Sequence, residues 1–340
     1  MAKTGNTVKL ATGGLAKIWK EYEDYLELGS DVVERTHFPT GVIALNQAIG
    51  DIDGITGGSI IQIIGESGRG KSTLSLDFLA QAQKKEINEV ELPNGKVINA
   101  VYADFERTFD ADYAATIGVD VAKVLVIKTP FAEDTFNIIE GLLNAGIQFV
   151  IVDSIPMIVP KSEEEKDYND NEKMASAAGV LGRFIKRSVQ LVDSADAVML
   201  LINQYRSNIS PMAHTDKKPY GARIIQYAIK VSISLERVKR EDKRMHIQAF
   251  VEKTKLGATG KKIEFQIVHG EGIDYNQHLL SLAVDYAIVG KSGAWYYYHP
   301  DGNATKEHNT HRAQGEGNAD KLPLEEIKGK VMEAMYREEA

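Results

Sequence analysis

The chain has 340 residues, of which 43% are hydrophobic and 26% are charged, enough apolar material for one large core and a smaller satellite domain. Its formal net charge of −8 argues against a basic surface that coats nucleic acid along the whole molecule. The lack of cysteine excludes a disulfide framework and a thiolate metal site. No apolar run approaches the roughly 18 residues that span a bilayer, and no signal peptide is recognisable. We therefore expect a cytoplasmic protein without membrane contact.

The first predicted element is an amphipathic helix over residues 14–28. Leu15, Ile18, Trp19 and Tyr22 recur there at spacings of three and four, which is the period of one helix face. Turn residues between 29 and 41 separate this helix from the rest of the chain.

From 58 to 268 the pattern predicts strands that alternate with helices. The apolar runs are continuous, so the strands are expected to be buried on both faces, as in a mainly parallel sheet flanked by helices. The runs lie at 60–64, 100–103, 124–127, 149–152 and 197–202. Residues 87–99 predict a hairpin that turns at Pro93-Asn94-Gly95.

Beyond about 275 the alternation stops. An aromatic run at 295–298, a polar loop at 301–319 and a closing helix from about 323 indicate a small C-terminal domain. We predict three regions: an N-terminal helix and linker (1–35), an α/β core (36–275) and an α+β C-terminal domain (276–340).

The segment between 65 and 73 fits the phosphate-binding pattern G-x-x-x-x-G-K-[ST], and it follows a buried run and opens a helical one. Backbone N–H groups of such a loop surround phosphate oxygens at the start of the helix. Lys71 would reach the β- and γ-phosphates and Ser72 would coordinate Mg²⁺, so the segment predicts a site for a nucleoside triphosphate. The predicted nucleotide-binding residues here are Gly65, Glu66, Ser67, Gly68, Arg69, Gly70, Lys71, Ser72 and Thr73.

Two carboxylates complete the expected site. Asp153 ends the buried run 149–152, where it is either a second ligand of the metal ion or simply the last residue of a strand. Glu106 follows the run 100–103 and is either a general base for water or an exposed carboxylate.

These motifs resemble the bacterial RecA recombinases over residues 15–335, in family order and spacing, as in a divergent, possibly phage-encoded member. Apart from the phosphate-binding loop, no single motif is specific, but the ordered set is. The matching stretches are "FPTGVIALNQAIG", "GESGRGKST", "ADFERTFDADYAATIGVD", "VIVDS", "INQYR", "EFQIVHGEGI" and "GAWYYY".

The resemblance implies a role for each residue of the site. Glu106 falls on the catalytic glutamate, and Asp110 and Tyr113 fall on positions that contact adenine. Gln204 falls on the residue that senses the γ-phosphate. Lys253 and Lys255 match a pair that reaches the ATP of the neighbouring subunit, although a solvated strand face is the plainer interpretation of that spacing.

The resemblance also implies two DNA-binding loops, at 162–173 and 205–221. Met174 and Ile209 fall on positions that wedge between bases, although a core residue and a loop residue are the plainer interpretations. Segment 174–190 holds basic residues and no acidic one, which would extend a basic face toward phosphate, although solvated side chains on unrelated faces are the plainer interpretation. The implied DNA-contacting residues are Met174, Lys186, Arg187, Arg206, Ile209, Gly221, Ala222 and Arg223.

The chain departs from the family pattern in four places. Ser67 stands where glutamate is usual, loop 162–173 is acidic, and Ala222 stands where a second glycine is usual. The hairpin at 87–99 is an insertion.

The resemblance implies an ATP- and Mg²⁺-dependent recombinase. Such a protein forms a helical filament of its own copies on single-stranded DNA and exchanges strands with homologous double-stranded DNA. The alternatives are a hexameric helicase-type motor on the same core fold and a regulatory ATPase that binds protein instead of DNA.

Overall fold

The structure is a computed structural model that describes residues 14–23, 34–85, 87–163, 173–206 and 218–339. The chain divides into two compact units, residues 1–35 and 36–340. In the first unit, helix α1 (Gly14–Tyr22) confirms the start of the predicted helix, and residues 24–33 lie outside the described part. Ile18, Trp19 and Tyr22 of α1 are each about half exposed.

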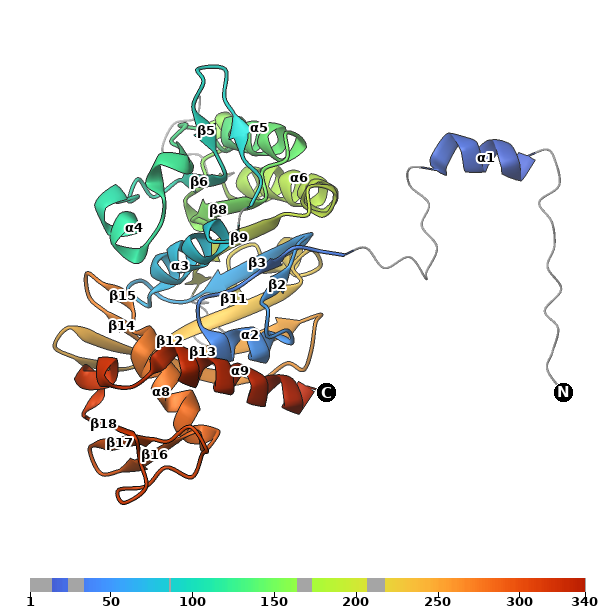
Figure 1. Cartoon of the computed structure of the whole chain (residues 1–340). Helices are drawn as coiled ribbons and strands as arrows, with labels where there is room; N and C mark the ends of the chain where they lie inside the picture. The colour runs from blue at the N-terminus through green and yellow to red at the C-terminus, as the bar shows by residue number, and fades with distance from the viewer. Residues whose placement is uncertain (1–13, 24–33, 86, 164–172, 207–217, 340) are drawn as a thin grey trace, which may run out of the picture. The chain divides into compact units, whose positions relative to one another are not determined.

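The second unit is built on a nine-stranded sheet with the order β15-β14-β13-β12-β3-β9-β8-β6-β7 (Figure 1). The strands from β12 to β7 pair in parallel. The continuous apolar runs predict this for β3, β6, β7, β8 and β9, whereas no run is predicted at β12. Their bounds are β3 (Ser59–Ile64), β6 (Ala100–Asp104), β7 (Val124–Ile127), β8 (Phe149–Asp153), β9 (Val198–Asn203) and β12 (Val231–Glu241).

The other edge of the sheet is antiparallel, so the predicted alternation of strands and helices is wrong between 231 and 268. Here β12 pairs with β13 (Arg244–Thr254), β13 with β14 (Lys262–Val268) and β14 with β15 (Gly272–Ile273). Antiparallel neighbours need only a tight turn, such as Asp242-Lys243 between β12 and β13, and this leaves no room for a crossover helix.

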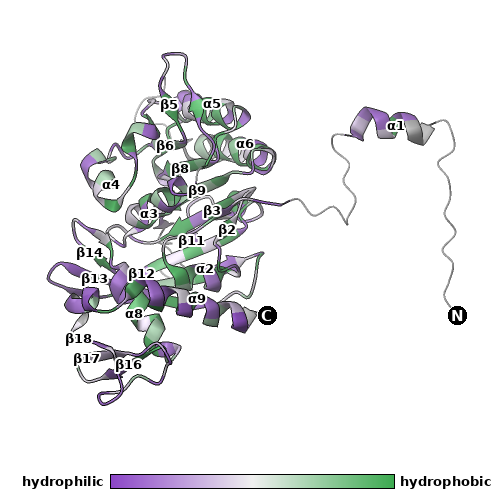
Figure 2. Ribbon diagram, in the orientation of Figure 1, coloured by the Kyte–Doolittle hydropathy of each residue, from purple (hydrophilic) through white to green (hydrophobic). Residues whose placement is uncertain are grey.

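Helices cover both faces of the sheet. On one face lie α5 (Ala132–Asn144) and α6 (Lys173–Ser194), where the rings of Phe136 and Phe184 stack 3.9 Å apart. On the other face lie α2 (Ile43–Ile49), α3 (Lys71–Gln83) and α4 (Ala111–Ile117). Figure 2 colours the strands between these layers mostly green, which matches their burial.

Shorter elements connect these layers. The predicted hairpin at 87–99 is confirmed as β4 (Val90–Glu91) paired with β5 (Val97–Ile98). The remaining elements are β1 (His37–Phe38), β2 (Ile55–Thr56), β10 (Tyr205–Arg206), β11 (Lys218–Pro219), α7 (Ala222–Ile225) and the 3₁₀ turns Val121–Lys123, Ile155–Met157, Lys161–Glu163 and Glu316–Lys321.

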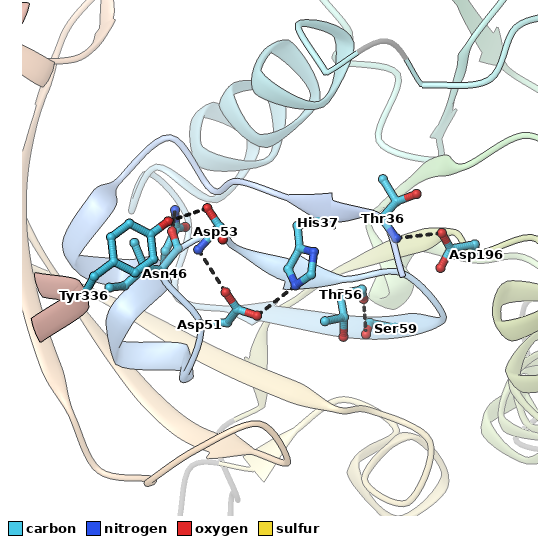
Figure 3. A network of polar contacts seen from close by, with 10 residues as sticks. Thr36, His37, Asn46, Asp51, Asp53, Thr56, Ser59, Asp196 and Tyr336 are labelled. Atoms are coloured by element: carbon cyan, nitrogen blue, oxygen red, sulfur yellow. Dashed lines mark hydrogen bonds and ion pairs between the residues drawn. The ribbon is translucent and has the colours of Figure 1, made fainter. Parts of the chain in front are cut away.

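A third apolar cluster lies in the C-terminal part. It contains α8 (Tyr275–Asp285), the sheet of β16 (Val289–Ser292), β17 (Trp295–Tyr298) and β18 (His311–Gln314), and α9 (Leu324–Glu339). Ile52, from the loop after α2, belongs to the same cluster. Tyr336 of α9 donates to Asp53 at 2.7 Å, within a polar network that continues through Asp51 to His37 (Figure 3).

One buried carboxylate joins three parts of the second unit. Asp77 on α3 is fully buried and accepts a hydrogen bond from the hydroxyl of Tyr275 at the start of α8. Its other face lies against Gly41, where a Cβ atom would stand 2.0 Å from Asp77 Oδ2. Gly41 has φ 83°, so glycine is required there for both conformation and space. Burial raises the pKa of Asp77 to about 7.

Asp77→Asn is expected to change how stability depends on pH. The folded protein holds a proton on Asp77 more tightly than the unfolded chain, so wild-type stability falls as pH rises from 3.8 toward 7. The asparagine variant does not titrate at this position and lacks this loss. Its free energy of unfolding, relative to that of wild type, should therefore rise by about 2 kcal/mol from pH 5.5 to pH 8. Urea unfolding at both pH values measures it, and parallel pH curves for the two proteins would contradict the prediction.

Candidate active site

The phosphate-binding loop occupies the carboxyl end of β3 and leads directly into α3. Gly68 and Gly70 have φ values of 68° and 81°, a conformation that glycine adopts without strain. A Cβ on Gly70 would also stand 2.4 Å from the side chain of Ile267 on β14. The sheet edge therefore packs against the loop and requires its last glycine.

Lys71 is the first residue of α3 and is buried at the floor of the loop. Its Nζ donates to the carbonyl oxygen of Glu66 at 2.9 Å. Burial lowers the pKa of Lys71, and the carboxylates of Asp153 and Glu106 oppose that shift. Arg69, beside it, is engaged by an ion pair with Glu66 at 2.8 Å.

Asp153 lies at the end of β8, directly beside the start of α3. Its Oδ2 accepts hydrogen bonds from the hydroxyl of Ser72 at 2.8 Å and from that of Tyr102 at 2.5 Å. Burial raises the pKa of Asp153. A hydroxyl and a carboxylate oxygen at this spacing are hard donors, so the pair fits Mg²⁺.

Backbone hydrogen bonds position Glu106 above this pair. The N–H groups of Phe105 and Glu106 both donate to the carbonyl of Asp153, at 2.7 and 3.3 Å. Buried Asp104 shapes the following turn by accepting from the N–H groups of Thr108 and Phe109, at 3.0 and 3.1 Å. Glu106 is thereby held at the carboxyl ends of β6 and β8, where sheet ligands bind.

Two donors share one oxygen of Glu106. The hydroxyl of Ser154 and the amide Nε2 of Gln204, the latter at 3.3 Å, both donate to Oε1. Gln204 is also tied to the following loop, because Tyr220 donates its N–H to the Gln204 carbonyl at 3.1 Å. A change in the loop that displaces Gln204 therefore alters the hydrogen bonding of Glu106.

These groups surround a cavity of about 380 Å³. The predicted residues that line it are Ser67, Gly68, Arg69, Gly70, Lys71, Ser72, Thr73, Glu106, Asp153 and Gln204. Gly65 and Glu66 lie in the loop beside it but do not line it. Asp110 caps the N-terminus of α4 by accepting from the N–H of Tyr113 at 3.0 Å, and the Tyr113 hydroxyl lies 2.9 Å from Thr73 Oγ1.

Lys253 and Lys255 lie away from the cavity that holds Lys71. Lys253 donates to the carbonyl of Gln226, and Lys255 lines a separate groove of about 850 Å³ between α6, α7 and the residues that precede β12. Lys186 and Arg223 line the same groove. Neither lysine therefore lines the cavity of its own subunit that holds Lys71.

Of the other implied DNA contacts, Arg187 is exposed but forms an ion pair with Glu140 at 2.5 Å. Gly221 has φ 63° and immediately precedes α7. Ile209 lies outside the described residues, as does most of both implied loops. Met174, Arg206 and Ala222 are described by their backbone alone, in α6, β10 and α7.

Sequence reasoning missed six residues of this site: Ser154, which donates to Glu106, together with Tyr102, Arg237, Arg240, Met245 and His269. Tyr102 lies within an apolar run, and that pattern gives no sign of a role for its hydroxyl. The role is evident only from the hydrogen bond that the hydroxyl donates to Asp153. The last four line the cavity from the antiparallel edge of the sheet, which the pattern did not predict. Within the described ranges, no helix is long and apolar enough to cross a membrane.

Comparison with known proteins gives one consistent match. The sequence model of the RecA N-terminal domain matches residues 10–274. Protein RecA of Bacteroides thetaiotaomicron is 31% identical over 280 residues, covering 80% of this chain and 81% of that protein. Protein RecA of Chloroherpeton thalassium is 29% identical over 283 residues, covering 81% and 76%. Protein RecA of Nitratiruptor sp. is 30% identical over 281 residues, covering 80% and 78%.

Proposed function

The chain belongs to the RecA family, and we propose that it is an ATP-dependent recombinase that assembles as a helical filament on single-stranded DNA and pairs it with homologous double-stranded DNA. The matches do not favour the helicase-type motor or the regulatory ATPase. The observation that carries the proposal is the single cavity in which Lys71, Asp153, Glu106 and Gln204 converge.

The residues of the cavity divide the work of hydrolysis. The loop N–H groups and Lys71 bind the phosphates of ATP, and Ser72 and Asp153 would hold Mg²⁺, which supplies positive charge to the phosphate oxygens. Glu106 orients the attacking water and accepts its proton. Gln204, which donates to Glu106 and accepts from Tyr220 near the end of the second loop, couples this step to bound DNA.

The remaining assignments complete the proposal. Asp110 and Tyr113 contact adenine, and Lys253 and Lys255 reach the ATP of the neighbouring subunit. The chain is organised as a helix and linker (1–35), an ATPase core (36–275) and a small C-terminal domain (276–340). DNA is held by Met174, Lys186, Arg187, Arg206, Ile209, Gly221, Ala222 and Arg223, mainly through its phosphates, which leaves the base edges free for homology search.

The rate of ATP hydrolysis with and without single-stranded DNA tests this proposal. Stimulation by DNA, together with strand exchange between a single strand and a homologous duplex, is expected. A rate of ATP hydrolysis that does not change when DNA is added would favour the regulatory ATPase. Closed rings instead of open helices in electron micrographs would favour the helicase-type motor.

The salt dependence of DNA binding is a further expected result. Binding to single strands should weaken by roughly 0.7 log units per log unit of salt for each phosphate neutralised. Lys186→Ala should reduce that slope by about one such step. Arg187→Ala should reduce it less, because Glu140 already neutralises Arg187.

Fluorescence anisotropy of a labelled oligonucleotide at several salt concentrations measures these slopes. Lys328→Ala, which removes an exposed lysine from α9, is the control and should leave the slope unchanged. Binding that does not respond to salt would show that base wedging, not phosphate contact, dominates.

A further inference from the structure

Two arginines in the nucleotide cavity have no role in the proposed mechanism. Arg237 and Arg240, both on β12, line the same cavity as Lys71 and Glu106. They belong to the subunit that supplies the phosphate-binding loop. Within the described part of the chain, neither forms an ion pair.

A β-bulge turns both arginines toward the cavity. Arg237 pairs with Ile247, Lys239 with His246 and Arg240 with Met245, which leaves Val238 without a partner. In a regular strand, residues 237 and 240 would point to opposite faces. The extra residue places both beside Ile247 and Met245, on the face of the sheet where Ile247 packs in the same core as α3.

In the hairpin of β12 and β13, this geometry determines which charged side chains line the cavity. Lys239, between the two arginines, forms an ion pair with Glu241 and does not line the cavity. The carboxylates of the cavity already have donors, since Ser72 and Tyr102 donate to Asp153 and two other groups donate to Glu106. The two guanidinium groups therefore remain available for an anion from outside the chain.

A phosphate group is the anion that suits these two guanidinium groups best. The planar guanidinium fork matches the oxygens of a phosphate, and two forks beside one ammonium suit a multiply charged anion. The loop N–H groups surround the inner phosphates, so the terminal phosphate carries the charge that remains for additional cations.

We infer that Arg237 and Arg240 bind the terminal phosphate of the nucleoside triphosphate within the same subunit. This inference rests on the proposed function, because it assigns the ligand of the same cavity. It implies that the subunit discriminates triphosphate from diphosphate before any neighbour or DNA is bound.

Nucleotide binding by the full chain without DNA tests the inference. Titration calorimetry with a non-hydrolysable ATP analogue and with ADP compares wild type, Arg237→Gln, Arg240→Gln and the double variant. Each single variant should lose on the order of tenfold in affinity for the triphosphate and much less for ADP, as charge-assisted hydrogen bonds to the terminal phosphate are removed. Lys239→Gln removes the same charge from the same hairpin and should bind both nucleotides as wild type does.

Three outcomes would overturn the inference: unchanged triphosphate affinity in the double variant, an equal loss in Lys239→Gln, or an equal loss for ADP. A defect confined to DNA binding would also overturn it and would assign the arginines to DNA. Circular dichroism of each variant checks that it is folded. Lys71→Ala, measured in parallel, separates the two proposals. Wild-type nucleotide affinity in Lys71→Ala would contradict the proposed function. Reduced affinity in Lys71→Ala together with unchanged affinity in the arginine variants would contradict only this inference.

Discussion

Lys71→Ala is expected to abolish ATP-dependent DNA binding and to reduce nucleotide affinity on the order of a hundredfold, through the loss of charge-assisted hydrogen bonds to phosphate. Lys71 is buried at the floor of the loop, and its Nζ is already positioned by the carbonyl of Glu66. The alanine variant has no positive charge at this buried position. Nucleotide titration and DNA binding with and without ATP measure both effects.

A matched control lies directly after the last residue of the same helix. Lys84→Ala removes an exposed lysine at the other end of α3 and should behave as wild type. DNA-stimulated turnover in Lys71→Ala at the wild-type rate would rule out this cavity as the site of hydrolysis.

The second large effect concerns Lys255. Lys255→Ala should retain nucleotide binding and lose DNA-stimulated hydrolysis, because Lys255 lines a groove away from the cavity and would act on the nucleotide of a neighbour. A cation supplied across a subunit boundary contributes about 10³–10⁵ in rate when it is arginine. Lysine lacks the planar fork, so we expect a loss near or below the lower bound.

Mixing variants tests whether this lysine acts between subunits. Glu106→Gln retains Lys255 but lacks the general base, so a Lys255→Ala subunit beside it has both groups at the shared boundary. The mixture should therefore recover part of the hydrolysis that each variant lacks alone. Lys261→Ala, which removes another exposed lysine from the segment between β13 and β14, is the control. A mixture that co-assembles and stays inactive would show that Lys255 does not act across the boundary.

The parallel half of the fold could be predicted because its signal is local. Strands buried on both faces are continuous apolar runs, and β3, β6, β7, β8 and β9 coincide with the predicted runs to within one residue. The antiparallel edge could not be predicted as readily, because β13 alternates between buried and partly buried residues and follows β12 after only a tight turn. A pattern of continuous runs does not detect such strands.

The site divides in the same way. The loop motif and the strand-end carboxylates could be identified because short-range patterns fix their place at the carboxyl ends of strands. Arg237 and Arg240 could not be identified in this way. A separation of three residues along a regular strand predicts that their side chains lie on opposite faces, and the bulge between them has no signal in the sequence. The ion pair between Arg187 and Glu140 joins two helices and has no local signature either.

The order of the strands also governs when a growing chain acquires its nucleotide site. β3 is made early, yet its two neighbours are β9, which begins at Val198, and β12, which begins at Val231. Pairing of strands so far apart in sequence is slow, because the chain loses the entropy of closing a long loop before any stabilising contact forms. The strand that carries the phosphate-binding loop thus gains its second neighbour only after two thirds of the protein has left the ribosome. Until then its exposed edge is open to other chains, and this favours early engagement by chaperones.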